Sequence, residues 1–110
     1  GIGSFAITSV DLTLDAQGDP GAVWIFQMPS STLTVGNSRQ VILLNGEAQP
    51  ANIYWQVGSA ATLGTTSVVE GNILAYASIT LESGAMLNGS ALAQNGAVTL
   101  DTSTVTKPTP

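Results

Sequence analysis

The stretch NIYWQVGSAATLGTTSVVEG, residues 52–71, decides the fold that the sequence predicts. It contains three short apolar runs, IYWQV, ATLG and SVVEG, which are separated by at most three small or polar residues. Such connectors are too short for hairpins between long strands, but they suit a backbone that turns a shallow corner and then runs straight. We therefore interpret this stretch as one coil of a β-solenoid, which the rest of the chain repeats with variations.

Three columns of similar residues emerge when the apolar runs are aligned. The first column holds Thr-Leu pairs, at Thr13, Thr32, Thr62, Thr80 and Thr99. The second column is at Leu43–Gly46, Val68–Gly71, Met86–Gly89 and Thr104–Thr106. The third column is at Val23–Gln27, Ile53–Val57, Asn72–Tyr76 and Ser90–Gln94.

The leucine of the first column recurs at nearly even intervals, with one enlarged coil, at Leu14, Leu33, Leu63, Leu81 and Leu100. A period near 18 to 20 with three strands is typical of one turn of a triangular parallel β-helix. An antiparallel β-sandwich also has short strands at regular spacing. Because the same tripeptide recurs in the same slot, the solenoid is the favoured interpretation.

Side chains alternate along a strand, so each column predicts an inward and an outward set. The first column points its leucines inward and its threonines outward. The second column points Leu44, Val69, Leu87 and Val105 inward. Its outward positions are Leu43, Val68, Met86 and Thr104, followed by Asn45, Glu70, Asn88 and Thr106.

The third column is apolar on both sides of its strands, so its outer side needs a cover. No segment shows a helical apolar period that could provide one. We expect a missing part of the same chain, or a partner, to cover the face with Trp24, Tyr54 and Leu74.

The composition excludes several classes of function. The 110 residues suit a single domain, only 8% are charged and the net charge is −5. With Arg39 and Lys107 as the only basic residues, nucleic-acid binding is effectively excluded and an anionic membrane surface is disfavoured. The chain has no Cys and no His, so it lacks a disulfide framework, the commonest metal ligand and the commonest general base.

The acidic residues Asp15, Glu82 and Asp101 share the first column. Paired carboxylates could act in acid catalysis or bind Ca²⁺, but Thr34 and Gly64 intervene between Asp15 and Glu82, which favours solvated turn acids. A Ser or Thr nucleophile would lack a His or Lys base nearby. We therefore predict a protein without enzymatic activity, metal or cofactor.

The flat outer surface is the remaining candidate for function. Threonines repeated at the strand separation of about 4.8 Å would present a regular array of hydroxyl and methyl groups. Such an array can hold water near the positions of an ice lattice. The simpler interpretation is that Thr is a good strand residue on an exposed face.

With these motifs in place, residues 52–105 resemble the C-terminal half of the DUF3494 ice-binding proteins, and residues 11–35 fit the same family's preceding coils. The resemblance implies a right-handed, discontinuous β-solenoid of triangular cross-section with one long helix alongside. The family's N-terminal half, including that helix, has no counterpart here. We therefore expect residues 1–110 to be a partial domain.

The resemblance also implies a function. Members of the family are secreted microbial proteins that adsorb to ice through one flat, irregular face, and this pattern fits the second column better than the first. The favoured ice-binding residues are Leu43, Asn45, Thr66, Val68, Gly84, Met86, Asn88, Thr102 and Thr104. The alternative face holds Thr13, Thr32, Thr62, Thr80 and Thr99.

Glu70 departs from the family pattern, because a charged group orders water differently from ice. The alternative function is a non-catalytic structural or adhesive module of a secreted protein, in which the ice chemistry has been lost.

Overall fold

The computed structural model describes residues 5–7, 11–19, 21–28, 31–44 and 49–106. Its elements, in chain order, are β1 (Phe5–Ile7), β2 (Leu12–Leu14), β3 (Trp24–Met28), β4 (Leu33–Val35), β5 (Val41–Leu43), the 3-10 turn η2 (Pro50–Asn52), β6 (Ile53–Val57), β7 (Ala61–Leu63), β8 (Val68–Ala75), β9 (Ile79–Leu81), β10 (Met86–Ala93), β11 (Val98–Leu100) and β12 (Thr104–Thr106). None of the helices among these residues is long and apolar enough to cross a membrane.

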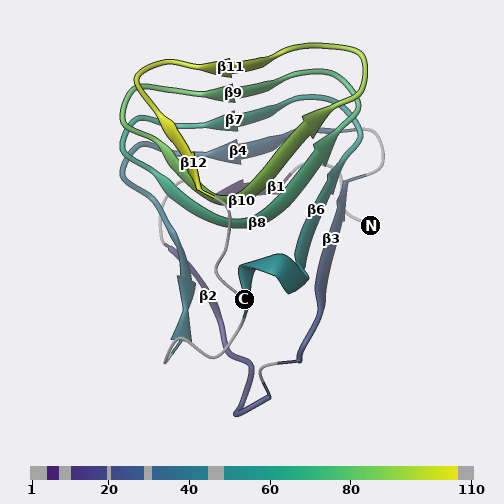
Figure 1. The fold of residues 1–110 in the computed structure, drawn as a ribbon, viewed down its shortest axis with the longest axis vertical. Coiled ribbons are helices and arrows are strands. Elements are labelled where there is room, and N and C mark those ends of the chain that lie inside the picture. Colours follow the sequence, from purple (N-terminus) through teal and green to yellow (C-terminus); the bar gives the residue numbers. More distant parts are fainter. Residues whose placement is uncertain (1–4, 8–10, 20, 29–30, 45–48, 107–110) are drawn as a thin grey trace.

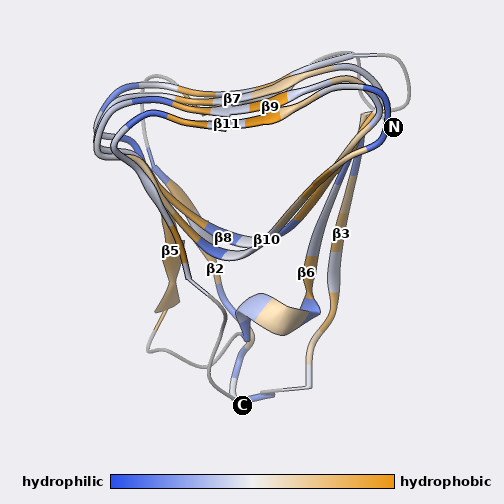
Figure 2. Ribbon diagram, turned by 45° about the horizontal axis from the view of Figure 1, so that its top comes forward, coloured by the Kyte–Doolittle hydropathy of each residue, from blue (hydrophilic) through white to orange (hydrophobic). Residues whose placement is uncertain are grey.

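The chain winds as a parallel β-solenoid, as the sequence predicts. Every strand pair of the described residues is parallel. Figure 1 shows the strands of successive coils stacked on one another, and Figure 2 shows the triangular cross-section. The predicted all-β class and triangular solenoid are confirmed.

The first wall of the triangle is the five-stranded sheet β1-β4-β7-β9-β11. Its register aligns Thr34, Thr62, Thr80 and Thr99 directly across the strands. The flanking residues Leu33, Leu63 and Leu81 are buried, because side chains alternate between the core and the solvent. The alternation predicted for this column is therefore confirmed for Thr62 and Thr80, whereas in the last coil Leu100, which the sequence predicts to point inward beside Thr99, is 50% exposed.

Coil lengths in the first wall differ from the prediction. The first two coils are long, because Phe5 pairs with Leu33 and Leu33 pairs with Ala61. The next two coils are short, and they run from Ala61 to Ile79 and on to Val98. The predicted step from Leu14 to Leu33 is wrong because Leu14 belongs to β2, which pairs with β5 on another wall.

The second and third walls share the sheet β12-β10-β8-β6-β3. The long strands β8 and β10 run along both walls and bend between them. The second wall contains residues 68–70, 86–88 and 104–106, together with the separate pair β2-β5. The third wall contains β3, β6 and residues 72–75 and 90–93.

The bend lies at two stacked glycines, Gly71 and Gly89. A Cβ atom on Gly71 would lie 2.6 Å from Cγ2 of Ile53, and its φ of 119° is one that L side chains rarely adopt. A Cβ atom on Gly89 would overlap the carbonyl oxygen of Gly71. The two short coils can therefore turn this corner within a single strand only because both positions lack a side chain.

The core lies inside the triangle and includes Trp55, which has no exposed surface. The Trp55 ring stacks on Phe26 with centroids 4.3 Å apart, and its Nε1 donates a hydrogen bond to the carbonyl oxygen of Glu70. Trp24 pairs with Ile53 and packs against this core. The prediction that Trp24 lies on the outer side of the third wall is therefore wrong by one residue, and Ile25 takes that place.

Candidate functional site

The second wall presents two outward rows on its three contiguous strands. Val68, Met86 and Thr104 align in the first row, which Gln40 extends through a parallel bridge to Val68. Met86 is 42% exposed, and Thr104 is exposed as well. The side chains behind this row are fully buried as predicted at Val69 and Leu87, whereas Val105 in the last strand is 37% exposed.

The second outward row of this wall contains Glu70, Asn88 and Thr106. Glu70 and Asn88 are half-buried, whereas Thr106 is exposed. Asn88 Nδ2 donates a hydrogen bond of 2.9 Å to Oε2 of Glu70. The two rows together form a narrow strip of small, aliphatic and amide side chains with one carboxylate.

Three of the predicted site residues, Thr66, Gly84 and Thr102, lie at the corner between the first and second walls. They are two positions before Val68, Met86 and Thr104 and all have positive φ angles, of 56°, 74° and 49°. Such left-handed conformations turn the backbone sharply. These residues therefore form the rim of the second wall instead of its flat part.

Ser38, which the sequence does not signal, shares this corner with a φ of 60°. Its hydroxyl lies 2.9 Å from that of Thr66, and one donates a hydrogen bond to the other. The sequence pattern misses both Ser38 and Gln40, because the segment Gly36–Gln40 contains no apolar residue that could be aligned with the other coils.

The predicted upper end of the face is corrected at Leu43. Leu43 pairs with Leu14 and packs against the core, and Gln40 occupies the position beside Val68. The inward residue of this coil is Val41, which is 2% exposed, whereas Leu44 is 38% exposed. Asn45 lies outside the described residues.

The Glu70 carboxyl has a pKa that its surroundings in the folded protein change. Burial raises its pKa above the usual value of 4.5, and the hydrogen bond from Asn88 partly offsets this rise. The cause is desolvation, which penalises the charged form.

We expect Glu70→Gln to stabilise the protein at neutral pH. Because the pKa of Glu70 is raised on folding, the folded state binds the proton more tightly than the unfolded state does. The protonated carboxyl therefore contributes stability that is complete below pH 4.5 and is lost as pH rises through the folded-state pKa. The variant should gain roughly 0.5 kcal/mol at pH 7, a size usual for a partly exposed site. Thermal melts at pH 3.5 and pH 7 check this, and a gain of equal size at both values would contradict it.

The first wall is the alternative face. Its outward ladder is Thr34, Thr62, Thr80 and Thr99, whose hydroxyl groups make no hydrogen bond within the described chain. Thr34 takes the place predicted for Thr32, which lies just before β4. The prediction for Thr13 is wrong, because Thr13 pairs with Ile42 in the second wall.

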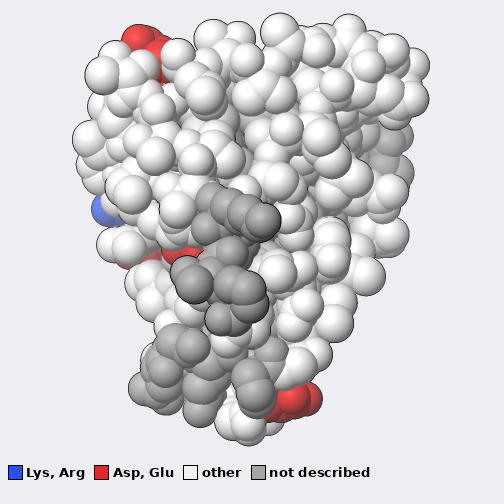
Figure 3. Space-filling view, in the orientation of Figure 1, with Lys and Arg blue, Asp and Glu red and all other residues white. Residues whose placement is uncertain are grey.

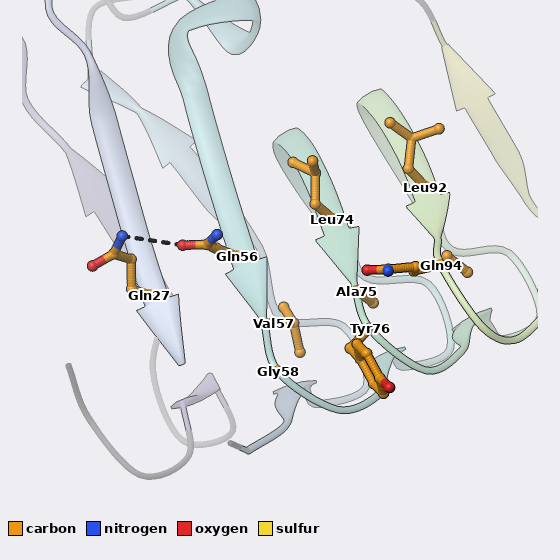
Figure 4. A pocket seen from close by; sticks show the side chains of 10 residues that line it. Gln27, Gln56, Val57, Gly58, Leu74, Ala75, Tyr76, Leu92 and Gln94 are labelled. Atoms are coloured by element: carbon orange, nitrogen blue, oxygen red, sulfur yellow. Dashed lines mark hydrogen bonds between the residues drawn. The ribbon is translucent and has the colours of Figure 1, made fainter. Parts of the chain in front are cut away.

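The outer side of the third wall is apolar and exposed, as predicted for Tyr54 and Leu74. Ile25 and Leu92 are about 60% exposed, Leu74 is 42% exposed and Tyr54 is 38% exposed. Figure 4 shows Leu74, Leu92 and Tyr76 projecting beside a groove of about 550 Å³. Gln27 donates a hydrogen bond to Gln56 at the margin of this groove.

Charge is sparse over the surface. In the view of Figure 3, the acidic atoms lie near the margins and most of the surface is uncharged. No group of three or more His, Cys, Asp or Glu side chains within the described residues could hold a metal ion.

The geometry defines a class of protein: a triangular parallel β-solenoid with flat, nearly uncharged outer walls. The profile of the Ice-binding-like family matches residues 2–106, and the chain belongs to this family. Its relatives include an ice-binding protein of Nostoc sp. (strain HG1), 52% identical over 95 residues that cover 86% of this chain and 34% of the relative. Another is an ice-binding protein of Flavobacterium frigoris (strain PS1), which is 43% identical over 98 residues that cover 89% of this chain and 34% of the relative.

Solved structures of ice-binding proteins have the same fold as this chain. An ice-binding protein from an Antarctic biological consortium is 48% identical with a TM-score of 0.91, and the match covers 97% of this chain and 47% of that one. The DUF3494 domain of Shewanella frigidimarina ice-binding protein 1 is 36% identical with a TM-score of 0.87, and the match covers 96% of this chain and 44% of that domain's chain. The chain thus spans about a third of the length of its sequence relatives and about half of these structures.

Proposed function

We propose that this chain is part of an ice-binding protein that adsorbs to ice through its second wall and thereby inhibits ice growth and recrystallisation. One observation carries the proposal: the rows Val68–Met86–Thr104 and Glu70–Asn88–Thr106 align without a register break on parallel strands. Strands about 4.8 Å apart repeat these side chains at a fixed interval. A hydrogen-bonded solenoid holds the interval rigidly, so little conformational entropy is lost on adsorption.

The two kinds of side chain have different roles. The apolar groups of exposed Met86 and half-buried Val68 hold water weakly, which favours replacing ordinary hydration with an ordered layer. The hydroxyl group of Thr104 and the amide of Asn88 can hydrogen-bond to that layer and anchor it. The rim hydroxyls of Thr66 and Thr102 extend the anchoring set to the corner. We propose no catalytic step.

The second wall is favoured over the first for a physical reason. The first wall is flanked by the exposed carboxylates Glu82 and Asp101, which hold their own hydration. The regular Thr ladder of that wall is also what strand propensity alone favours. On the contiguous segments 68–70, 86–88 and 104–106 of the second wall, the single carboxylate is half-buried and already hydrogen-bonded to Asn88.

The apolar outer side of the third wall supports a second part of the proposal. We propose that the family's N-terminal half, with its long helix, covers Ile25, Tyr54, Leu74 and Leu92. Full burial of a side chain of this size contributes about 1.5 to 3 kcal/mol, and covering the exposed 38–62% of these side chains would contribute roughly half of that for each. Residues 1–110 would then be about the C-terminal half of the domain, in a secreted protein.

The experiment is ice-affinity partitioning of this chain beside the chain extended by the family's N-terminal half, hereafter the extended protein. We expect the extended protein to enrich in the ice fraction and to inhibit recrystallisation, and the short chain to melt at a lower temperature. A folded extended protein that stays in the liquid would contradict the proposal. Binding to glycans by that same protein would instead favour the structural or adhesive module.

A further inference from the structure

Glu70 is the one ionisable side chain on the described strand segments 68–70, 86–88 and 104–106 of the second wall. It is the last residue of this wall before the bend at Gly71, and it lies in one row with Asn88 and Thr106. Its backbone is fixed, because the carbonyl oxygen accepts the hydrogen bond from Trp55 Nε1 at 2.9 Å. The backbone of Glu70 is therefore anchored to the core, and its carboxyl group is held by the hydrogen bond from Asn88.

We infer that Glu70 attenuates ice adsorption and makes its strength depend on pH, with the neutral carboxyl giving the tighter binding. The inference rests on the proposed function of the second wall. Glu70 does not create the site in this account; it sets the affinity of a site made by its neighbours.

Two physical effects produce the attenuation. A carboxylate binds water strongly and orients it around the charge, so an ice-like layer can form above Glu70 only if this shell is removed or distorted. The carboxylate also accepts the Nδ2 hydrogen bond of Asn88, which turns a donor of the anchoring row away from the water layer. Protonation removes the charge and weakens the hold on Asn88.

Among the described residues, no other charge accounts for the raised pKa of this group. The elements that pack against β8, namely β5, β6, β7, β10 and η2, contain no Asp, Glu, Lys or Arg, and Tyr54 of β6 faces the third wall. Asp11 and Arg39 pair with each other at 3.7 Å ahead of β2 and β5. Glu47 and Lys107 lie outside the described residues. Desolvation by burial raises the pKa of Glu70, and the hydrogen bond from Asn88 opposes this rise.

The test measures the lowest concentration of extended protein that inhibits ice recrystallisation, between pH 4 and pH 7. The variants are Glu70→Gln, which keeps an acceptor for Asn88, and Glu70→Thr, which copies Thr106 in the same row. Glu82→Gln is the matched control, because it removes an exposed acid from the first wall. Circular dichroism melts at each pH show that every variant is folded.

We expect the unaltered protein to become about fivefold more effective as pH falls through the pKa of Glu70, because a charge no longer has to be desolvated at the ice surface. Glu70→Gln and Glu70→Thr should show this higher effectiveness already at pH 7 and should lose the pH dependence. Glu82→Gln should retain it.

Two outcomes would overturn the inference: both Glu70 variants follow the pH profile of the unaltered protein, or both are less effective at every pH. Met86→Lys, measured at pH 7, separates this failure from failure of the proposed function. If Met86→Lys abolishes inhibition while the Glu70 variants behave as the unaltered protein, only the role of Glu70 is wrong. If Met86→Lys has no effect, the second wall is not the ice-binding site.

Discussion

Met86→Lys is expected to lower ice adsorption of the extended protein by at least about tenfold. Removing the hydration of a charged side chain at an apolar or ordered surface costs well above about 1.4 kcal/mol, which is the free energy of a tenfold change in binding. Met86 lies in the middle of the first outward row, between Val68 and Thr104, and is 42% exposed. A longer, strongly hydrated ammonium group at this point would hold the whole wall away from a flat crystal.

The fold should tolerate this change, because the Met86 side chain points away from the core and its neighbours Ala85 and Leu87 fill the inner side. Ice-affinity partitioning measures the loss, and a thermal melt shows that the variant remains folded. Met86→Leu is the matched control, because it conserves the volume and the apolar character and should partition as the unaltered protein. Full partitioning of a folded Met86→Lys variant would refute the assignment of this wall.

Gly89→Ala is expected to have the largest effect on stability, roughly 3 kcal/mol or more, because overpacking against backbone cannot be relieved by a rotamer change. The new Cβ atom would overlap the carbonyl oxygen of Gly71 in the coil below. The bend in β10 would then have to open, which breaks the pairing with β8 on both sides of the corner.

A urea titration followed by circular dichroism measures this loss in the extended protein. Gly21→Ala is the control, because the nearest atom to its new Cβ would be Oδ1 of Asp19, at 3.3 Å, on an exposed turn. We expect the control to change stability by less than about 0.5 kcal/mol. Equal stability of the two variants would show that the close approach of the two glycines does not determine the corner.

The sequence predicts the later coils well and the earlier coils poorly, and the reason is insertion. Between Thr62, Thr80 and Thr99 the coils are short and nearly equal in length, so the repeat alone gives the correct register. In the first two coils, the added residues lie between the second and third walls. The runs Leu12-Thr13-Leu14 and Leu33-Thr34-Val35 have the same alternation, so nothing in the pattern assigns them to different walls.

The third column shows a different limit. The run Val23–Phe26 is apolar at both its odd and its even positions, so side-chain alternation cannot decide which residues point inward. The pairing of Trp24 with Ile53, together with the stacking of Phe26 on Trp55, makes that choice, and both are contacts between residues far apart in sequence. A shift of the strand pairing by one residue moves every side chain of the strand to the opposite face of the sheet.

For the candidate site, register could be predicted but shape could not. Val68, Met86 and Thr104 align as the sequence indicates. That Thr66 and Thr102 form a rim follows from left-handed backbone conformations, which residues other than glycine rarely adopt and which the sequence does not signal here.

The most direct test of the account compares two matched variants of the extended protein, Thr104→Tyr on the second wall and Thr99→Tyr on the first. Both threonines are exposed, they lie in the consecutive terminal strands β11 and β12 on different walls, and the substitution is identical. The measurement is the fraction of each variant that partitions into ice. We predict a strong loss for Thr104→Tyr and no loss for Thr99→Tyr. The reverse result, with Thr99→Tyr excluded from ice and Thr104→Tyr retained, would contradict the assignment of the second wall.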